Sequence, residues 1–347
     1  MTPLERWQAV LGRKVPDRVP TDYWGTDETT DLLKRRLGCA TKRGLLEKLR
    51  VDFLVDAKPE YAGPKLPRLT DVFGCRFRNV GYGPGRYREC VEAPLAKFGS
   101  VAEIEKSYRW PNPDWWDYGS IRGKLRGLDR YPVRGGGSEP FLTYKYLRGE
   151  EQAFVDLIEN PEIVHYAVDR LFDLAYENTR RILETIPGRV TVVYVAEDLG
   201  GQTDLMFSTA HIREFLLPGM KRMIDLAHSA GAFVFHHDDG SVRRILPDLI
   251  TAGIDLLNPI QWRCPGMERE GLKRDFGDRI VLHGGVDNQQ TLPFGTVEDV
   301  RREVLENIAV LGRGGGYILA PCHNIQPVTP PENVIAMYET ACENGWY

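Results

Sequence analysis

Residues Phe233 to Gly240 read FVFHHDDG, an apolar run that ends in two histidines and two aspartates. In a strand, alternate side chains point to the same side, so Phe235, His237 and Asp239 share one face at and just beyond the end of the run. A His-x-Asp pair at the mouth of a buried strand has the chemistry to hold a metal ion or to move protons. This stretch therefore predicts a buried strand that delivers a polar site.

The pattern of a short apolar strand followed by a helix repeats on both sides of this stretch, with a period of roughly 25 to 35 residues. A doubly wound sheet accommodates such alternation, but eight units favour a single (β/α)8 TIM barrel spanning residues 1–347. The eight expected strands lie at residues 19–24, 51–57, 131–134, 189–196, 232–238, 254–259, 279–286 and 317–320, the third of them ending in the glycine turn 135–137.

Two segments fall outside this repeat. Residues 4–11 predict an amphipathic helix that precedes the first strand as an N-terminal extension. Residues 58–116 are rich in Gly, Pro and aromatic residues, and they contain alternating stretches at 76–80 and 86–91. We expect an antiparallel β-hairpin insertion over one mouth of the barrel, which serves either as a lid or as surface packing.

Composition excludes several classes of partner. The net charge is -4 and long Lys/Arg runs are absent from the sequence, which argues against nucleic acid and against an anionic membrane surface. The sequence has neither an apolar signal core at its start nor a stretch approaching 18 apolar residues, so we expect a cytoplasmic protein. Six cysteines without CxxC spacing fit reduced thiols. The glycine runs form no nucleotide-binding motif.

Polar residues gather where the later strands are expected to end. In a (β/α)8 barrel the active site is built at the carboxyl ends of the strands, so residues at these positions should meet at one rim. Each residue alone also has a structural explanation, such as a helix cap or a buried, hydrogen-bonded histidine. The candidates are Glu197 and Asp198, His237 and Asp239, Asn258 and Gln261, His283 and Asp287, and His323 and Asn324.

Five motifs spread along the chain carry a resemblance to a known family. They are PDRVP at 16–20, FLLP at 215–218, HDDG at 237–240, HGG at 283–285 with Asp287, and PCH at 321–323 with PxxPPEN at 327–333. With these motifs the sequence resembles the uroporphyrinogen decarboxylase family. That family includes the decarboxylase of haem synthesis and a branch of cobamide-dependent methyltransferases, all single (β/α)8 barrels, and related barrels often pair as homodimers.

The segment after the first strand separates the two branches. The haem-pathway decarboxylases resemble one another in an arginine-rich segment there, whereas this chain reads YWGTD at residues 23–27. A tetrapyrrole with several carboxylates needs cationic partners, and an acidic, aromatic segment supplies none. We therefore expect a smaller substrate. The candidate substrate-binding residues are Tyr23, Trp24, Asn258, Gln261, Asp287 and Asn324.

The resemblance to the methyltransferase branch implies a metal site. Those proteins hold zinc with a His-x-Cys-Gly motif and a second cysteine after the last strand. Here His237 matches the histidine, Asp239 stands in the first cysteine position, and His323 takes the second, with Cys322 one residue away. Two imidazoles and one carboxylate leave the ion positively charged and hard, so that it is a better Lewis acid toward oxygen than a thiolate-bound ion.

These residues lead to a hypothesis of metal-dependent methyl transfer. A divalent ion, zinc before others, is bound by His237, Asp239 and His323 and polarises the oxygen of a small methoxy or hydroxyl substrate. The methyl group passes to a corrinoid on a partner protein, because the chain has no DxHxxG attachment motif. Glu197 or Asp198 is expected as a fourth ligand or as the general acid. Asp239 and His283 complete the catalytic candidates.

Two other functions are also compatible with the sequence. The first is a metal-free decarboxylase of a small carboxylated substrate, in which His323 and Asp239 hydrogen-bond the substrate and protonate a carbanion. The second is a catalytically inactive barrel that binds a small ligand or a partner protein. Turnover separates the inactive barrel from the two enzymes, and sensitivity to chelation separates the enzymes from each other.

Overall fold

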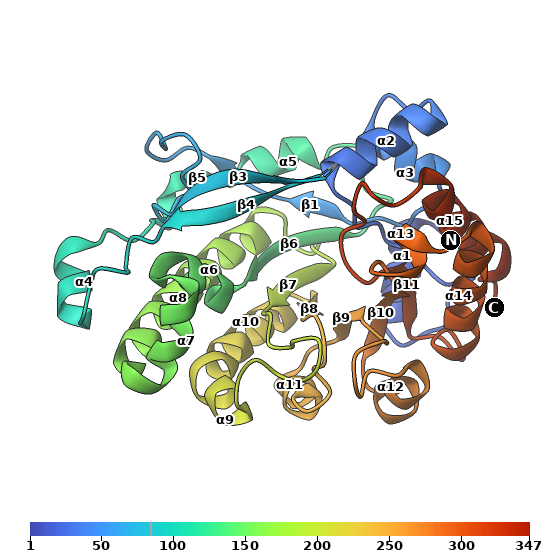
Figure 1. Ribbon diagram of the computed structural model, residues 1–347. Coiled ribbons are helices and arrows are strands. Elements are labelled where there is room, and N and C mark those ends of the chain that lie inside the picture. Colours follow the sequence, from blue (N-terminus) through green and yellow to red (C-terminus); the bar gives the residue numbers. More distant parts are fainter. Residues whose placement is uncertain (84) are drawn as a thin grey trace.

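A parallel sheet that curls into a barrel forms the centre of the computed structural model, which describes residues 1–83 and 85–347 (Figure 1). The sheet has seven strands in the order β1-β6-β7-β8-β9-β10-β11, and neighbouring strands are parallel. They are β1 (Val55–Ala57), β6 (Val133–Ser138), β7 (Val192–Ala196), β8 (Phe233–His237), β9 (Leu256–Ile260), β10 (Val281–Val286) and β11 (Tyr317–Pro321).

Residues 19–25 close the barrel between β11 and the chain that leads into β1. The Asp22 amide donates to the Leu319 carbonyl at 2.9 Å, and on the other side the Asp52 amide donates to the Thr21 carbonyl, also at 2.9 Å. The bridge between Thr21 and Leu319 is parallel, like the rest of the sheet. The segment predicted as the first of eight strands thus occupies the eighth place in the barrel, although its pairing is too irregular to form a regular strand. The predicted (β/α)8 fold is confirmed.

Helices connect the strands and cover the outside of the sheet (Figure 1). Helix α8 shows why: Pro161 stands at its first position, where a missing N–H costs nothing, and Val164, Val168 and Leu171 recur on the face that it buries. The covering helices are α2 (Asp27–Leu37), α3 (Lys42–Lys48), α6 (Pro140–Arg148), α7 (Glu150–Glu159), α8 (Pro161–Thr185), α9 (Thr209–His211), the π-helix Ile212–Leu216, α10 (Leu217–Ser229), α11 (Leu246–Ala252), α12 (Arg269–Phe276), α13 (Thr291–Phe294), α14 (Val297–Val310) and α15 (Pro331–Asn344).

The interior of the barrel is apolar at its amino-terminal end, where α1 (Pro3–Leu11) plugs it. Trp7 is completely buried, and its indole N–H donates to the Asp52 carbonyl at 2.6 Å. The helix begins at a capping box made by Thr2 and Glu5. Because this end is sealed, the carboxyl-terminal rim is the open end. The interior cluster consists of Trp7, Val10, Leu11, Val192, Phe235, Leu256, Val281 and Ile318.

The structure corrects the sequence-based expectation around the third strand. Strand β6 continues through Gly135, Gly136 and Gly137 instead of turning at them, and it leads into α6, which was not predicted. Gly137 has a φ of +142°, and a Cβ there would lie 2.1 Å from the Tyr194 carbonyl oxygen. Glycine is required because β6 approaches β7 too closely for a side chain.

The insertion forms the predicted hairpin. Strands β3 (Arg76–Tyr82) and β4 (Gly85–Glu92) pair antiparallel, and the hydroxyl of Tyr82 donates to the Gln326 side chain on the loop after β11. The hairpin therefore reaches the open rim. The rest of the insertion contains β2 (Glu60–Tyr61), α4 (Val101–Ser107) and the 3-10 helix Pro113–Trp115, followed by β5 (Trp116–Asp117), which pairs with β2, and by α5 (Ser120–Lys124).

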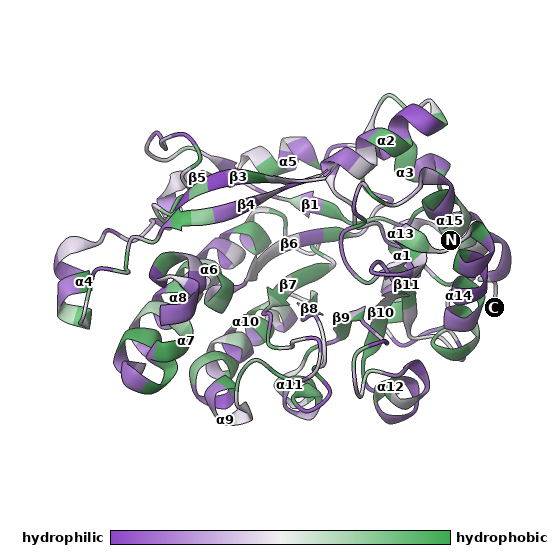
Figure 2. Cartoon of the chain, viewed as in Figure 1, coloured by the Kyte–Doolittle hydropathy of each residue, from purple (hydrophilic) through white to green (hydrophobic). Residues whose placement is uncertain are grey.

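Hydropathy follows these layers. Figure 2 shows β7 largely hydrophobic, whereas the outer helices carry hydrophobic and hydrophilic stripes. Within residues 1–83 and 85–347, none of the helices combines the length and the apolar character that spanning a membrane would require.

The plug helix provides a test of this architecture. We expect Trp7→Ala to lower the free energy of unfolding by about 3–5 kcal/mol, because it empties the sealed end of the barrel and removes a buried hydrogen bond. Urea denaturation measures the change. Phe294→Ala, at an aromatic residue that is 70% exposed, is the control and should change stability by less than about 0.5 kcal/mol. Equal changes in the free energy of unfolding for the two substitutions would contradict the role of Trp7 in sealing the barrel.

Candidate metal centre at the barrel rim

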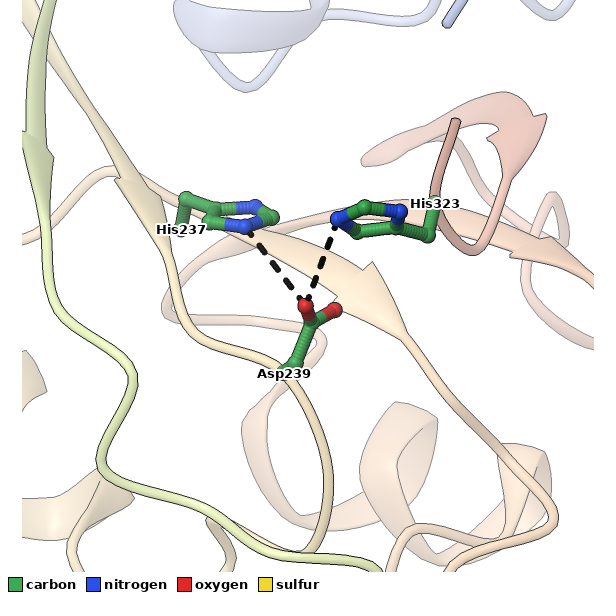
Figure 3. A group of neighbouring side chains, drawn as sticks. All are labelled: His237, Asp239 and His323. Atoms are coloured by element: carbon green, nitrogen blue, oxygen red, sulfur yellow. Dashed lines mark ion pairs between the residues drawn. The ribbon is translucent and has the colours of Figure 1, made fainter. Parts of the chain in front are cut away.

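Three side chains converge at the open rim of the barrel (Figure 3). His237 ends β8, Asp239 lies two residues later, and His323 follows β11. The Asp239 Oδ2 atom lies 3.8 Å from His237 Nε2 and 3.7 Å from His323 Nε2, and the three ligand atoms are all within 4.8 Å of one another. Strands β9 and β10 separate β8 from β11 in the sheet, so the curvature of the barrel brings these residues together.

The donor set and its spacing fit a divalent metal ion. Zinc binds imidazole nitrogen and carboxylate oxygen at about 2.0–2.2 Å, so tetrahedral ligands lie roughly 3.5 Å apart, close to the separations found here. Two histidines and one carboxylate leave at least one position open, as catalytic zinc sites do. The same donors also suit ferrous iron.

Burial differs across the three residues. His237 is 5% exposed, whereas the side chain of His323 is 43% exposed, so the site opens toward solvent on the His323 side. Burial raises the pKa of Asp239, and the two neighbouring histidines oppose that shift. A cation bound between these groups would favour the carboxylate form of Asp239.

The ring of His237 is held on three sides. Its Nδ1 atom bonds with Asn258 Oδ1 at 2.6 Å. The indole of Trp24 stacks against it with ring centroids 5.3 Å apart, and the ring of Tyr194 does so at 5.8 Å. Because Nδ1 is occupied by Asn258, Nε2 is the nitrogen that faces Asp239. Metal-binding histidines in proteins are commonly held in this way through their second nitrogen.

Hydrogen bonds between the loops after β7 and β8 hold the segment that carries Asp239. The Ser241 amide donates to the Gly201 carbonyl at 2.8 Å, and Asp238 Oδ1 accepts from the amides of the loop after β7. A Cβ on Gly200 would lie 2.2 Å from the Asp239 carbonyl oxygen, so only glycine permits this approach. Gln261, a predicted substrate-binding residue, accepts the Gly240 amide at 2.9 Å and so helps to hold the loop.

Comparison with known proteins identifies the family. Residues 118–343 match the family described as Uroporphyrinogen decarboxylase (URO-D). The chain belongs to this family. A uroporphyrinogen decarboxylase of Pseudomonas entomophila is 27% identical over 275 residues, which cover 72% of this chain and 71% of the relative. That of Pseudomonas fluorescens strain Pf0-1 is 27% identical over 286 residues, which cover 75% and 74%.

A solved structure shows the same fold over the whole chain. The methyltransferase from Methanosarcina mazei superposes on this URO-D family member with a TM-score of 0.67 and 22% identity, covering 99% of each chain. The family match confirms the resemblance inferred from the sequence motifs, and this superposition confirms the barrel architecture.

Several residues expected at the site of this URO-D family member make contacts within the protein instead. Glu197 is completely buried, its pKa is raised well above its usual value by burial, and it accepts the Phe141 amide at 2.9 Å at the start of α6. The hydroxyl of Tyr23 bonds with Thr30 at 2.9 Å. Asp287 pairs with Arg263 at 2.7 Å and caps α13, and His283 is fully buried beneath the rim.

Two cavities are lined by the aromatic residues that stack on His237, although the three rim residues themselves line neither of them. Trp24 and Asn324, both predicted to bind substrate, line a cavity of about 230 Å³, and Tyr194 lines a second cavity of about 350 Å³. Asp56 and Arg134 line both cavities and form an ion pair of 2.7 Å between them. The pair is not among the residues predicted from the sequence, because the predicted third strand ends at Arg134. Asp56, near the end of the second expected strand, is a usable signal.

Glu139 is a further residue that the sequence reasoning missed. It follows β6, lines the larger cavity and lies within the electrostatic reach of Asp198 and Asp239. Burial raises the pKa of Glu139 to about 7, and the negative charge of Asp198 adds to the shift. Asp198 itself is half-buried. The sequence predicts a turn at the glycine run before Glu139, and this conceals that Glu139 lies at the end of a strand.

The raised pKa of Glu139 predicts how stability depends on pH. Between about pH 4.5 and pH 7 the folded protein keeps a proton that the unfolded chain releases, so stability falls as pH rises through this window. Between pH 4.5 and pH 8 this effect should lower the free energy of unfolding of the wild type by an amount on the order of 2–3 kcal/mol, and Glu139→Gln should abolish that decrease. Urea unfolding of metal-free protein measures it, with exposed Glu159→Gln as control. If the stability of Glu139→Gln depended on pH in the same way as that of the wild type, the raised pKa of Glu139 would be contradicted.

Proposed function

We propose that this protein is a metal-dependent enzyme that removes a methyl group from an oxygen of a small substrate. The observation that carries the proposal is the convergence of His237, Asp239 and His323, with all three ligand atoms within 4.8 Å of one another. When bound there, a divalent ion, most simply zinc, supplies a Lewis acid that polarises a methoxy or hydroxyl oxygen.

Side chains around the proposed centre orient a metal ligand and supply a proton. Trp24 and Tyr194 stack on His237 and keep its Nε2 aimed at the centre of the site. Glu139, with a pKa of about 7, holds a proton that it can donate to the departing oxygen. As the carbon–oxygen bond breaks, the oxygen keeps the electron pair and takes this proton, and the methyl group leaves for the acceptor. Glu139 thereby takes the acid role first expected of Glu197 or Asp198.

The cavities favour a small substrate. Their volumes of about 230 and 350 Å³ suit a single-ring molecule, and Trp24, Trp116 and Tyr194 offer aromatic surfaces for it. Lys42 and Arg134 are the cations that line the smaller cavity, and Arg134 is already paired with Asp56. Lys58, on the larger cavity, is likewise paired with Asp56, so a tetrapyrrole with many carboxylates would find few cationic partners in the two cavities.

The methyl acceptor in this proposal is a reduced corrinoid carried by a partner protein. The motif resemblance to cobamide-dependent methyltransferases supports this choice, and so does the exposure of His323, which leaves the rim accessible to a second protein.

A second candidate function is decarboxylation of a small carboxylated substrate. It is favoured by the uroporphyrinogen decarboxylases of Pseudomonas, which are 27% identical to this chain. In this reading Asp239 and His323, 3.7 Å apart, protonate the carbanion without a metal.

Metal analysis tests the proposed centre. We expect purified wild-type protein to bind about one zinc or iron ion per chain. Asp239→Ala should weaken that affinity by roughly a hundredfold or more, because even residues that only support metal ligands contribute 10- to 100-fold. Isothermal titration with zinc and elemental analysis measure the change. Asp225→Ala, at an exposed aspartate on α10, is the matched control. Absence of metal binding by the wild type would refute the centre.

A methyl-transfer assay separates the two functions. With free cob(I)alamin as acceptor and a panel of methoxy-substituted single-ring aromatics, we expect methylcobalamin to form. Chelation should abolish the reaction, zinc should restore it, and Glu139→Gln should slow it by about 10²- to 10⁴-fold. The readout is the absorbance of the corrinoid. Carbon dioxide release from carboxylated analogues that is insensitive to chelator would favour the decarboxylase instead.

A further inference from the structure

Four polar side chains form one hydrogen-bonded row beneath the rim, across the inside of the barrel. Asp22 Oδ2 lies 3.2 Å from His283 Nε2, and His283 Nδ1 lies 2.7 Å from Asn258 Nδ2. Asn258 Oδ1 lies 2.6 Å from His237 Nδ1. The four residues come from the closing segment 19–25, β10, β9 and β8, and none is more than 5% exposed.

The side-chain amide of Asn258 sets the direction of every hydrogen bond in this row. Its NH₂ group can only donate, so His283 accepts at Nδ1 and donates through Nε2–H to Asp22. Its carbonyl oxygen can only accept, so the Nδ1 atom of His237 carries the proton. The remaining nitrogen, Nε2, is left with its lone pair.

The surroundings keep the row in this arrangement. The Trp24 indole N–H and the Tyr23 amide donate to the Asp22 carboxylate at 3.0 and 2.8 Å, which holds that end in place. The rings of Trp7 and Phe235 lie 6.0 and 5.1 Å from that of His283, so apolar groups flank its hydrogen bonds. Hydrogen bonds are stronger in such a low-dielectric setting, and an unpaired polar group there is costly. Reversing one bond would require reversing the others.

We propose that Asp22 and His283, acting through Asn258, are positioning residues that set the tautomer of His237 and present its Nε2 lone pair to the rim. The tautomer follows from the row itself. The use of that lone pair as a metal ligand rests on the proposed function. Disrupting the row should weaken metal binding about 10- to 100-fold, as is usual for groups that support a metal-binding histidine.

The experiment uses histidine-labelled (¹⁵N) full-length protein, free of metal, and reads the protonated nitrogen of each ring by NMR. We expect His237 to carry its proton on Nδ1 and His283 on Nε2. His283→Gln should preserve the row, because the amide oxygen accepts from Asn258 while its NH₂ group donates to Asp22. His283→Leu removes both functions, so His237 should populate both tautomers, and zinc affinity should fall about 10- to 100-fold.

Asn333→Leu is the matched control. Asn333 is 3% exposed and donates to two backbone carbonyls outside the row. It should lose stability while keeping the His237 tautomer and the wild-type zinc affinity. If His283→Leu fails to fold, the wild-type tautomers and the His283→Gln variant still decide the question.

The outcomes separate the row from the proposed function. A proton on His237 Nε2, or a doubly protonated His283 at pH 7.5, would overturn the row. Equal losses of zinc affinity in His283→Gln and His283→Leu would overturn the positioning role. The expected tautomers in a wild-type protein that binds no zinc or iron would uphold the row and refute the metal centre.

Discussion

Closure of the parallel sheet by residues 19–25 is the constraint on which the rest of the structure depends. This segment bonds to Leu319 on one side and to Asp52 on the other, and it joins the two edges that a seven-stranded parallel sheet would leave exposed. Closure places the carboxyl ends of β8 and β11 on one rim. It also brings Asp22 beneath that rim, where it ends the row that reaches His237.

The two ends of the barrel differ in the side chains that they carry. At one end Trp7 and its apolar neighbours seal the interior, so that end contributes to stability and not to chemistry. At the other end carboxylates and imidazoles come together, which costs stability unless they are hydrogen-bonded, ion-paired or bound to a cation. Asp56 is satisfied by Arg134, whereas Asp239 faces two histidines at separations longer than a hydrogen bond. That arrangement is typical of a functional site.

The sequence predicts the strands of the barrel, and it predicts the rim residues that directly follow a strand. His237 and Asp239 follow a buried strand, and their shared face follows from the twofold period of a strand. Prediction from the sequence fails where a residue's role depends on a neighbour far along the chain. Glu197 looks like a site residue but caps α6, and Glu139, hidden behind a glycine run, lies in the cavity.

The repeat of strands and helices, the family, and the chemical types of side chain at the strand ends can be inferred from the sequence, because they depend on local periodicity and on motifs. Which of those side chains meet depends on the closed barrel. His237 and His323 are 86 positions apart in the chain (323 − 237), and their distance in space depends on the curvature of a closed sheet. The bonding of His237 through Asn258 to Asp22 was likewise invisible in the sequence, because it joins four separate segments that only the barrel brings into contact.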